Sequence, residues 1–429
     1  MVTLSHLSWA TLAPELLSLI HEIIAEDFLE SKTNADLAHK QAYPWDTRNR
    51  DKKTALPPLA LKHVARVNKH WHDVANRGLY KVLFIQREQT IKRLVRTVTS
   101  NPALLPFIKS VSIDYKFNNL PTQKKALQKA LAIRKKANQH TWQFLRLLEP
   151  GRLKHLSLEW QSVSPLPSST DDESALLPCL DGVVSLSLVA NHSDARSISE
   201  VLHPAAATLR RLSLDVRYME SWTDTIPNDL KLTCIRLHTP NLNVGGLQLL
   251  LRSGTIEYLN FVYGYDMKIT PQELQPEFFK IAPKLRGLHI EMPHAFSARR
   301  KEFIETVITV LHSTQHLETL HLSLEKDDVD AIVAAGLPAT LRDFILDYRV
   351  TEHSLTYEAG IVEALQQVSS SILAQTLPAL RRLAIGSSLH TSPVPIVGNP
   401  FTSQVVSAAD QGVSLRLLDL FPYEIPWDA

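Results

Sequence analysis

The stretch LRGLHIE at residues 285–291 decides the fold of this chain. Apolar residues occupy its first, fourth and sixth positions, and the residues between them are polar or small. In an extended segment neighbouring side chains point to opposite faces, so the fourth and sixth positions share one face and the fifth points away. The stretch therefore predicts a short strand with one buried face.

The same spacing recurs along most of the chain. Apolar residues at positions i, i+3 and i+5 define eleven copies. The copies begin at Ile108, Leu153, Val183, Leu209, Leu232, Ile256, Leu285, Leu317, Leu341, Leu380 and Leu415. This pattern accounts for the abundance of leucine, which supplies 66 of the 429 residues. Self-similarity at a spacing of about 20 to 50 residues is typical of solenoids, in which each unit buries its apolar face against its neighbours.

The segments between the predicted strands have helical periodicity. Apolar residues recur at helical spacing over 303–311 and again over 361–372. Thr270, Pro271 and Glu273 form a helix start signal, with a capping hydroxyl, a proline in the first turn and a glutamate three residues after the cap. Strand, loop, helix and loop then alternate, and right-handed crossovers place such strands in a parallel sheet backed by helices.

The eleven copies resemble leucine-rich repeats, whose pattern is L-x-x-L-x-L followed by an asparagine. The resemblance covers about residues 105–422 and implies an irregular α/β solenoid with a parallel sheet backed by helices. Only Asn191 occupies the asparagine position clearly, so a regular asparagine ladder and a uniform horseshoe do not follow. An ordinary doubly wound sheet is the alternative fold.

Residues 1–100 lack the repeat and instead carry two helical stripes. One runs over 12–24 behind Thr11, and the other runs over 59–79. Between them, residues 31–58 are polar and end in two prolines, which is typical of a long loop or insertion. We expect two or three helices in front of the repeats.

The two stripes resemble an F-box, a small helical domain that binds the Skp-type linker of a cullin-RING ubiquitin ligase. The residues that match its motif are Leu12, Pro14, Leu16, Leu17, Ile20, Val64, Val67 and Trp71. Ala13 replaces the first proline of the motif, and roughly 25 extra residues separate the two helices. The alternative is that these helices only cap the open end of the solenoid.

The resemblances imply a domain order. An F-box-like domain spans 10–82 with a polar insertion at 31–58, a linker follows at 83–104, the repeats occupy 105–422, and a tail covers 423–429. Residues 91–113 resemble the junction in fungal F-box proteins.

The repeats also predict which side chains face a partner. If positions i, i+3 and i+5 are buried, positions i+2, i+4 and i+6 line the concave face. Its candidate substrate-binding residues are Glu159, Asp215, Arg236, Tyr258, His289, Glu291, His321 and Asp347. Position i+6 is acidic with apolar interruptions, which favours a basic or polar segment of a target protein.

Composition and motifs argue against several other classes. The net charge of +2 gives no global attraction to nucleic acid or membrane, and two cysteines are too few for a disulfide scaffold or a four-thiolate zinc site. No stretch is long and apolar enough to span a bilayer. No motif for covalent, phosphoryl or hydride chemistry is present. We therefore expect no catalytic residue, no cofactor, no metal, and a cytoplasmic or nuclear location.

Two local features leave alternatives open. His289, Glu291 and His321 fall on adjacent predicted strands, where a metal site and a solvated face are both compatible with the residue types. The basic run over 124–136 fits an exposed helix face, a nuclear address or a contact with an anionic partner.

The function these features imply is that of a substrate-recognition adaptor of an SCF-type cullin-RING E3 ubiquitin ligase. The F-box would bind the Skp-type linker and thereby the cullin scaffold, and the repeats would bind an unknown target protein. The adaptor itself would catalyse no reaction. The alternative is a leucine-rich-repeat interaction scaffold whose N-terminal helices are only a cap, and the third reading is an enzyme built on the concave face.

Overall fold

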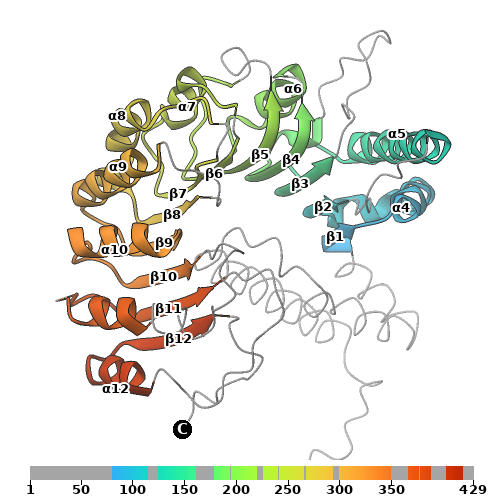
Figure 1. Ribbon diagram of the computed structural model, residues 1–429. Coiled ribbons are helices and arrows are strands. Elements are labelled where there is room, and N and C mark those ends of the chain that lie inside the picture. Colours follow the sequence, from blue (N-terminus) through green and yellow to red (C-terminus); the bar gives the residue numbers. More distant parts are fainter. Residues whose placement is uncertain are drawn as a thin grey trace, which may run out of the picture. The chain divides into compact units, whose positions relative to one another are not determined.

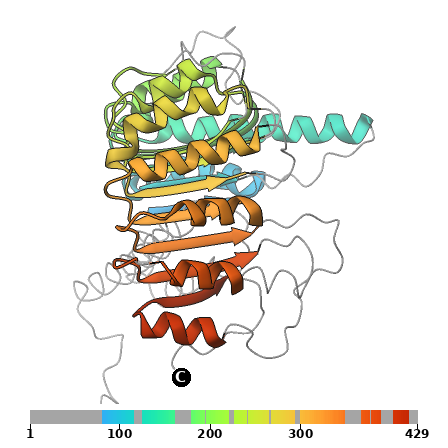
Figure 2. The same cartoon turned by 60° about the vertical axis from the view of Figure 1, so that its left-hand side comes forward.

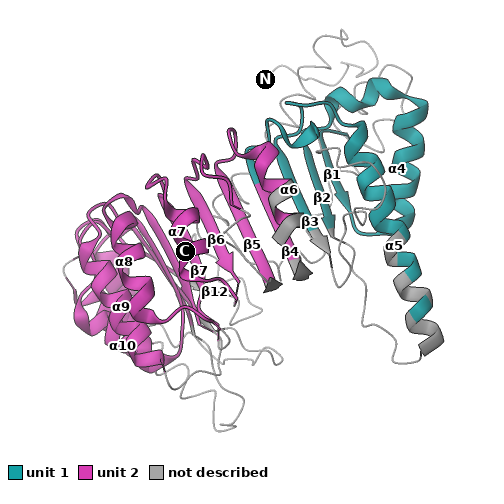
Figure 3. Ribbon diagram, turned by 90° about the horizontal axis from the view of Figure 1, so that it is seen from above, with its two compact units in different colours: residues 1–185 teal, residues 186–429 magenta. Residues whose placement is uncertain are grey.

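A computed structural model describes this chain over most of its repeat region. The described residues are 80–114, 124–160, 178–193, 195–219, 226–239, 241–264, 267–292, 299–348, 366–375, 377–387 and 402–418. They belong to two compact units, residues 1–185 and 186–429 (Figure 3). The F-box-like segment, its insertion and the tail at 423–429 lie outside the described residues, except that positions 80–82 are included.

The described part of unit 1 contains three parallel strands with helices between them. Its elements are β1 (Val82–Ile85), α4 (Glu88–Ser100), η3 (Pro102–Phe107), β2 (Ser110–Asp114), α5 (Lys124–Leu147), β3 (His155–Trp160) and η4 (Pro178–Leu180). Strand β2 pairs with β1 on one side and with β3 on the other. The segment expected to be a linker at 83–104 therefore contains a strand and a helix.

Strand β1 belongs to a further copy of the repeat. Leu83 pairs with Val111 and Ile85 with Ile113, so these two residues occupy positions i+3 and i+5, and Tyr80 occupies position i. Tyrosine in place of the first leucine, next to the F-box-like segment, concealed this copy in the sequence. The repeat pattern thus begins before residue 105.

Unit 2 continues the same alternation of strand and helix. Its elements are β4 (Ser185–Ser193), α6 (Ala195–Ala205), β5 (Arg211–Met219), β6 (Cys234–His238), α7 (Val244–Leu251), β7 (Tyr258–Val262), α8 (Pro271–Ile281), η5 (Ala282–Lys284), β8 (Gly287–Glu291), α9 (Arg300–Ser313), β9 (Thr319–Ser323), α10 (Lys326–Ala335), β10 (Asp343–Tyr348), β11 (Arg382–Ser387), α12 (Thr402–Asp410) and β12 (Ser414–Leu418). The strand order in the sheet follows the chain. Helices cover one face of these strands, as Figures 1 and 2 show for α8 to α10.

The apolar seam predicted from the repeat is the core of both units. In the ten copies that begin at residues 108 to 380, every side chain at i, i+3 and i+5 is at most 3% exposed. Burial of a leucine or isoleucine at this level stabilises by about 1.5 to 3 kcal/mol. The parallel sheet backed by helices is therefore confirmed, and the same seam drives its formation in every copy.

The last copy has a different register from the one expected. Leu383 pairs with Leu415 and Ile385 with Leu417, so Leu415 and Leu417 stand at i+3 and i+5. The expectation that Leu415 begins the copy was wrong. The run LRLLDL at 415–420 offers two apolar frames, and hydrogen bonding to β11 selects the earlier one.

The local helix signals are largely confirmed. Thr270 caps α8 in a full capping box with Glu273, and α9 buries Phe303 and Val307 as its periodicity predicted. The helix expected over 361–372 is described only from residue 366, and there Val368 and Ile372 are buried.

Threonine hydroxyls join successive copies of the repeat at two places. Thr255 and Thr340 each precede the first apolar residue of a copy. Their hydroxyls donate to the carbonyl oxygens of Leu232 and Leu317, the first apolar residues of the copies before, at 2.7 and 2.8 Å. Successive turns are thus tied together at the amino-terminal ends of the strands.

Candidate functional site

The candidate site is the sheet face of unit 2 that carries positions i+2, i+4 and i+6 of the repeat. We call this surface, on strands β5 to β10, the polar face. The strand register places its side chains in three rows across the sheet, with neighbouring strands about 4.8 Å apart. Each row brings together residues of neighbouring strands that lie 23 to 32 positions apart in the chain.

The i+6 row lies at the carboxyl ends of the strands and is mainly polar. Asp215 pairs with His238 on the next strand, and the two side chains are in contact, with 2.9 Å between Asp215 Oδ1 and His238 Nδ1. Farther along, the Ser323 hydroxyl donates to Asp347 at 3.4 Å. Two of the expected carboxylates are therefore engaged by neighbouring side chains on the same face.

The i+4 row forms a continuous polar line through the middle of the strands. Arg236, Asn260, His289 and His321 occupy four consecutive rungs. The Asn260 Nδ2 lies 2.5 Å from His289 Nδ1, and the His289 and His321 rings stack with centroids 3.7 Å apart. If the Asn260 amide donates this bond, His289 Nδ1 accepts it and the proton of a neutral ring lies on Nε2.

Burial distinguishes the members of this row. Asn260, His289 and His321 are 1%, 8% and 5% exposed, whereas Arg236 is half-buried. Little of either imidazole is therefore accessible, although the sequence placed both on the face that would meet a partner. Ring stacking and the Asn260 contact also stabilise this part of the sheet.

The i+2 row lies at the amino-terminal ends of the strands. Half-buried Tyr258 pairs with Gly287, and its ring lies over that glycine, because a Cβ placed there would be 2.5 Å from Tyr258 Cδ1. Farther along, Arg382 donates two hydrogen bonds to Asp343, at 2.5 and 2.8 Å. These bonds raise the pKa of Arg382, although its partial burial acts in the opposite direction.

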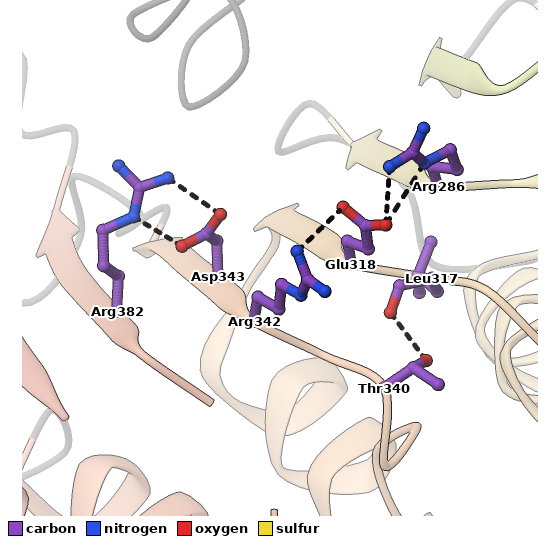
Figure 4. A network of polar contacts seen from close by, with 7 residues as sticks. All are labelled: Arg286, Leu317, Glu318, Thr340, Arg342, Asp343 and Arg382. Carbon is purple, nitrogen blue, oxygen red and sulfur yellow. Dashed lines mark hydrogen bonds and ion pairs between the residues drawn. The ribbon is translucent and has the colours of Figure 1, made fainter. Parts of the chain in front are cut away.

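A second charged network lies beside this row, at position i+1. Glu318 accepts a 2.7 Å bond from Arg286 and lies 3.8 Å from Arg342 (Figure 4). The hydrogen bond from Arg286 to Glu318 raises the pKa of Arg286. Alternating signs thus neutralise one another across three neighbouring strands.

The structure brings together most of the sequence-predicted face residues. Glu159 lies on β3 of unit 1, where its backbone pairs with Asp114, and the other seven lie on the polar face. The eight F-box-like residues, Leu12 to Trp71, lie outside the described residues. Sequence reasoning did not select Asp343 or Glu318. Asp343 stands at i+2, like Arg382, and Glu318 stands at i+1, like Arg286, so both opposite-charge pairs could have been found by comparing equivalent positions of the repeat.

The polar face carries guanidinium, carboxylate and phenol groups at regular spacing, and the imidazoles of His289 and His321 are largely buried between them. Among the described residues, no three His, Cys, Asp or Glu side chains are grouped so that they could hold a metal ion. No helix of the described ranges combines the length and apolar character needed to cross a bilayer.

Comparisons with known proteins show only distant likeness. No protein-family model and no curated protein matches this chain. A crystal structure of a Bacteroides fragilis protein aligns at 13% identity and a TM-score of 0.36, over 68% of this chain and 71% of that chain. The crystal structure of the yeast Rad7 and Elc1 complex aligns at 14% identity and a TM-score of 0.31, over 96% of this chain and 98% of that chain.

Proposed function

We propose that this protein is a substrate-recognition adaptor of an SCF-type cullin-RING E3 ubiquitin ligase. Residues 10–82 bind a Skp-type linker, and the repeats bind the protein to be ubiquitinated. The observation that carries the proposal is the order of two patterns in one chain, an F-box-like motif at 12–20 and 61–80 followed directly by the repeats.

The polar face supports the second half of this proposal. Its strands carry rows of polar groups in a fixed register, and helices cover the opposite side of the same sheet (Figure 1). Half-buried Arg236 and Tyr258 stand on neighbouring strands. Arginine and tyrosine are enriched among the residues that dominate protein interfaces, because each combines a large contact area with a polar group.

The first half of the proposal predicts a helix-in-groove contact with the linker. Leu16 and Leu17 follow Pro14 in the motif and would bury their side chains against the partner. Each buried leucine contributes about 1.5 to 3 kcal/mol. Replacing both by lysine should therefore reduce linker capture at least about tenfold.

The experiment is co-purification of the full chain with a Skp-type linker. The wild type is compared with Leu16→Lys plus Leu17→Lys. The matched control is Leu4→Lys plus Leu7→Lys, which makes the same exchange upstream of the motif. Far-UV circular dichroism checks that each variant is folded. Failure of the wild type to capture the linker, or capture by Leu16→Lys plus Leu17→Lys that equals capture by the wild type, would favour the scaffold alternative instead.

A further inference from the structure

Charge is distributed very unevenly along this chain. Residues 80–160 contain sixteen Lys and Arg and only four Asp and Glu, a net charge of +12, whereas the whole chain carries +2. The other 348 residues therefore carry −10. The balanced total, which argued against a polyanionic partner, does not describe this part of unit 1.

Three lysines stand on consecutive rungs at the amino-terminal ends of β1, β2 and β3. The Lys109 N–H donates to the Lys81 carbonyl at 3.0 Å, and the Lys154 N–H donates to the Lys109 carbonyl at 2.8 Å. We call Lys81, Lys109 and Lys154 the lysine ladder. Burial lowers the pKa of Lys109, and the positive charges of Arg152, Lys154 and Lys81 lower it further. Each charged group that shifts this pKa is thus basic.

At the same repeat position, i+1, three neighbouring charges of unit 2 alternate in sign and pair with one another. There Arg286, Glu318 and Arg342 follow one another, and the glutamate pairs with both arginines. The lysine ladder has no acidic rung between its members. Lys154 Nζ donates to the Gly182 carbonyl at 3.4 Å, but like charges on adjacent rungs repel one another, so the repulsion within the ladder opposes the stability of the sheet.

Helices α4 and α5 of unit 1 are also rich in basic residues and poor in acidic ones. Helix α5 contains seven Lys and Arg and no Asp or Glu in its 24 residues. It begins with Lys124 and Lys125, at the end of the helix where the macrodipole favours acidic side chains. In α4, the exposed residues Lys92, Arg93 and Arg96 lie within five consecutive positions of the helix. Surface helices selected for stability usually pair opposite charges at i and i+4.

We propose that unit 1 binds the phosphodiester backbone of duplex nucleic acid through the lysine ladder and the basic helices α4 and α5. Helix α5 alone is about 36 Å long at 1.5 Å per residue, and a duplex carries about one negative charge per 1.7 Å of its axis. Basic groups spread over such a length match a long, evenly charged rod better than a short acidic peptide.

The test measures binding of the full chain to a fluorescein-labelled 20-bp DNA duplex by fluorescence anisotropy, between about 50 and 200 mM salt. The ladder variant is Lys81→Gln, Lys109→Gln and Lys154→Gln. A second variant, Lys92→Gln, Arg93→Gln and Arg96→Gln, changes only exposed positions of α4. Each should weaken binding about tenfold or more and reduce the slope of log K against log salt by about 2 to 3.

The matched control removes the same charge from unit 2 through Lys231→Gln, Lys268→Gln and Lys301→Gln, all at exposed positions. It should change affinity less than about twofold. An equal loss in the control would overturn the proposal, because net charge alone would then explain binding. Tighter binding to polyglutamate or to phosphatidylserine vesicles than to the duplex would also overturn it, in favour of an acidic protein or a membrane. Linker capture by these variants stays unchanged if the two proposals are independent.

Discussion

Gly287 is the residue whose missing side chain shapes the polar face most directly. Its backbone φ needs no glycine, but the ring of Tyr258 fills the space where a Cβ would stand. The tyrosine ring therefore reaches over the neighbouring strand β8 at this position. The position of Tyr258, a candidate recognition residue, therefore depends on the absence of a side chain at Gly287.

We predict that Gly287→Ala lowers the free energy of unfolding by about 1 to 2 kcal/mol. The new Cβ would sit 2.5 Å from Tyr258 Cδ1, so the ring must move and lose its packing. Chemical denaturation with urea measures the change. In a Tyr258→Ala background the cost should disappear, because no ring remains to be displaced. An equal cost in both backgrounds would show that the clash lies elsewhere.

Positions of individual residues on the polar face were readable from the sequence, but their contacts were not. The repeat assigned Asp215, His289 and His321 to one face, and the register agrees. The sequence did not reveal that Asp215 pairs with His238 or that the two imidazoles stack. Such contacts depend on rotamers and on small offsets between strands, which a spacing pattern does not contain.

At the scale of elements, capping decides where the helices begin. Thr270 and Glu273 exchange hydrogen bonds at the start of α8: Glu273 Oε2 accepts from the Thr270 N–H at 2.8 Å and from its hydroxyl at 2.9 Å. These bonds, the backbone bond first, lower the pKa of Glu273 below its ordinary 4.5. The capping box was visible in the sequence because its residues are local.

The lowered pKa of Glu273 predicts a pH-dependent contribution to stability. A carboxylate with a lowered folded-state pKa stabilises the fold above about pH 4.5, and this contribution is lost as the pH falls through the lowered value. Glu273→Gln should therefore be less stable than wild type by about 0.3 to 1 kcal/mol near pH 6. The difference should shrink steadily as the pH drops below about 4.5.

Urea denaturation at a series of pH values measures this difference. Thr97→Ala is a suitable control, because the Thr97 hydroxyl bonds only to the Arg93 carbonyl within α4 and no titrating group takes part. Its effect on stability should not change over the same pH range. If the difference for Glu273→Gln did not change with pH, the negative charge of Glu273 would not be what stabilises the start of α8.

Strands were predicted better in the middle of the repeat region than at its ends. The central copies have one apolar frame each, whereas the residues at 415–420 have two and β1 begins with Tyr80 in place of a leucine. Where the side-chain pattern is ambiguous, pairing with the neighbouring strand selects the register. The sequence alone could not supply that pairing partner.

At the scale of the whole molecule, each of the two units contains one cysteine, and the two cysteines differ in burial. Cys179 lies in η4 of unit 1 and is fully buried, which raises its pKa to about 12. Cys234 lies on β6 of unit 2 and is half-buried. Because the thiolate is the reactive form, burial and the raised pKa both protect Cys179.

We predict that only Cys234 reacts with Ellman's reagent in the native protein near neutral pH. The Cys234→Ser variant should show no thiol reaction until it is unfolded, when one equivalent appears. The reverse variant, Cys179→Ser, should react without denaturant. Reaction of Cys179 in the folded Cys234→Ser protein at the rate of Cys234 would contradict the burial of η4 in unit 1.

The sequence by itself determined the repeating unit, the buried seam and the face on which polar side chains gather, because all three follow from apolar spacing within a few residues. It also contained the +12 charge of residues 80–160. Only the tertiary structure decided which polar groups meet. Strand pairing places Lys81, Lys109 and Lys154 on adjacent rungs across 73 residues, and it joins Arg286, Glu318 and Arg342 in the same way. Contacts between distant residues depend on register, which the fold sets through backbone hydrogen bonds.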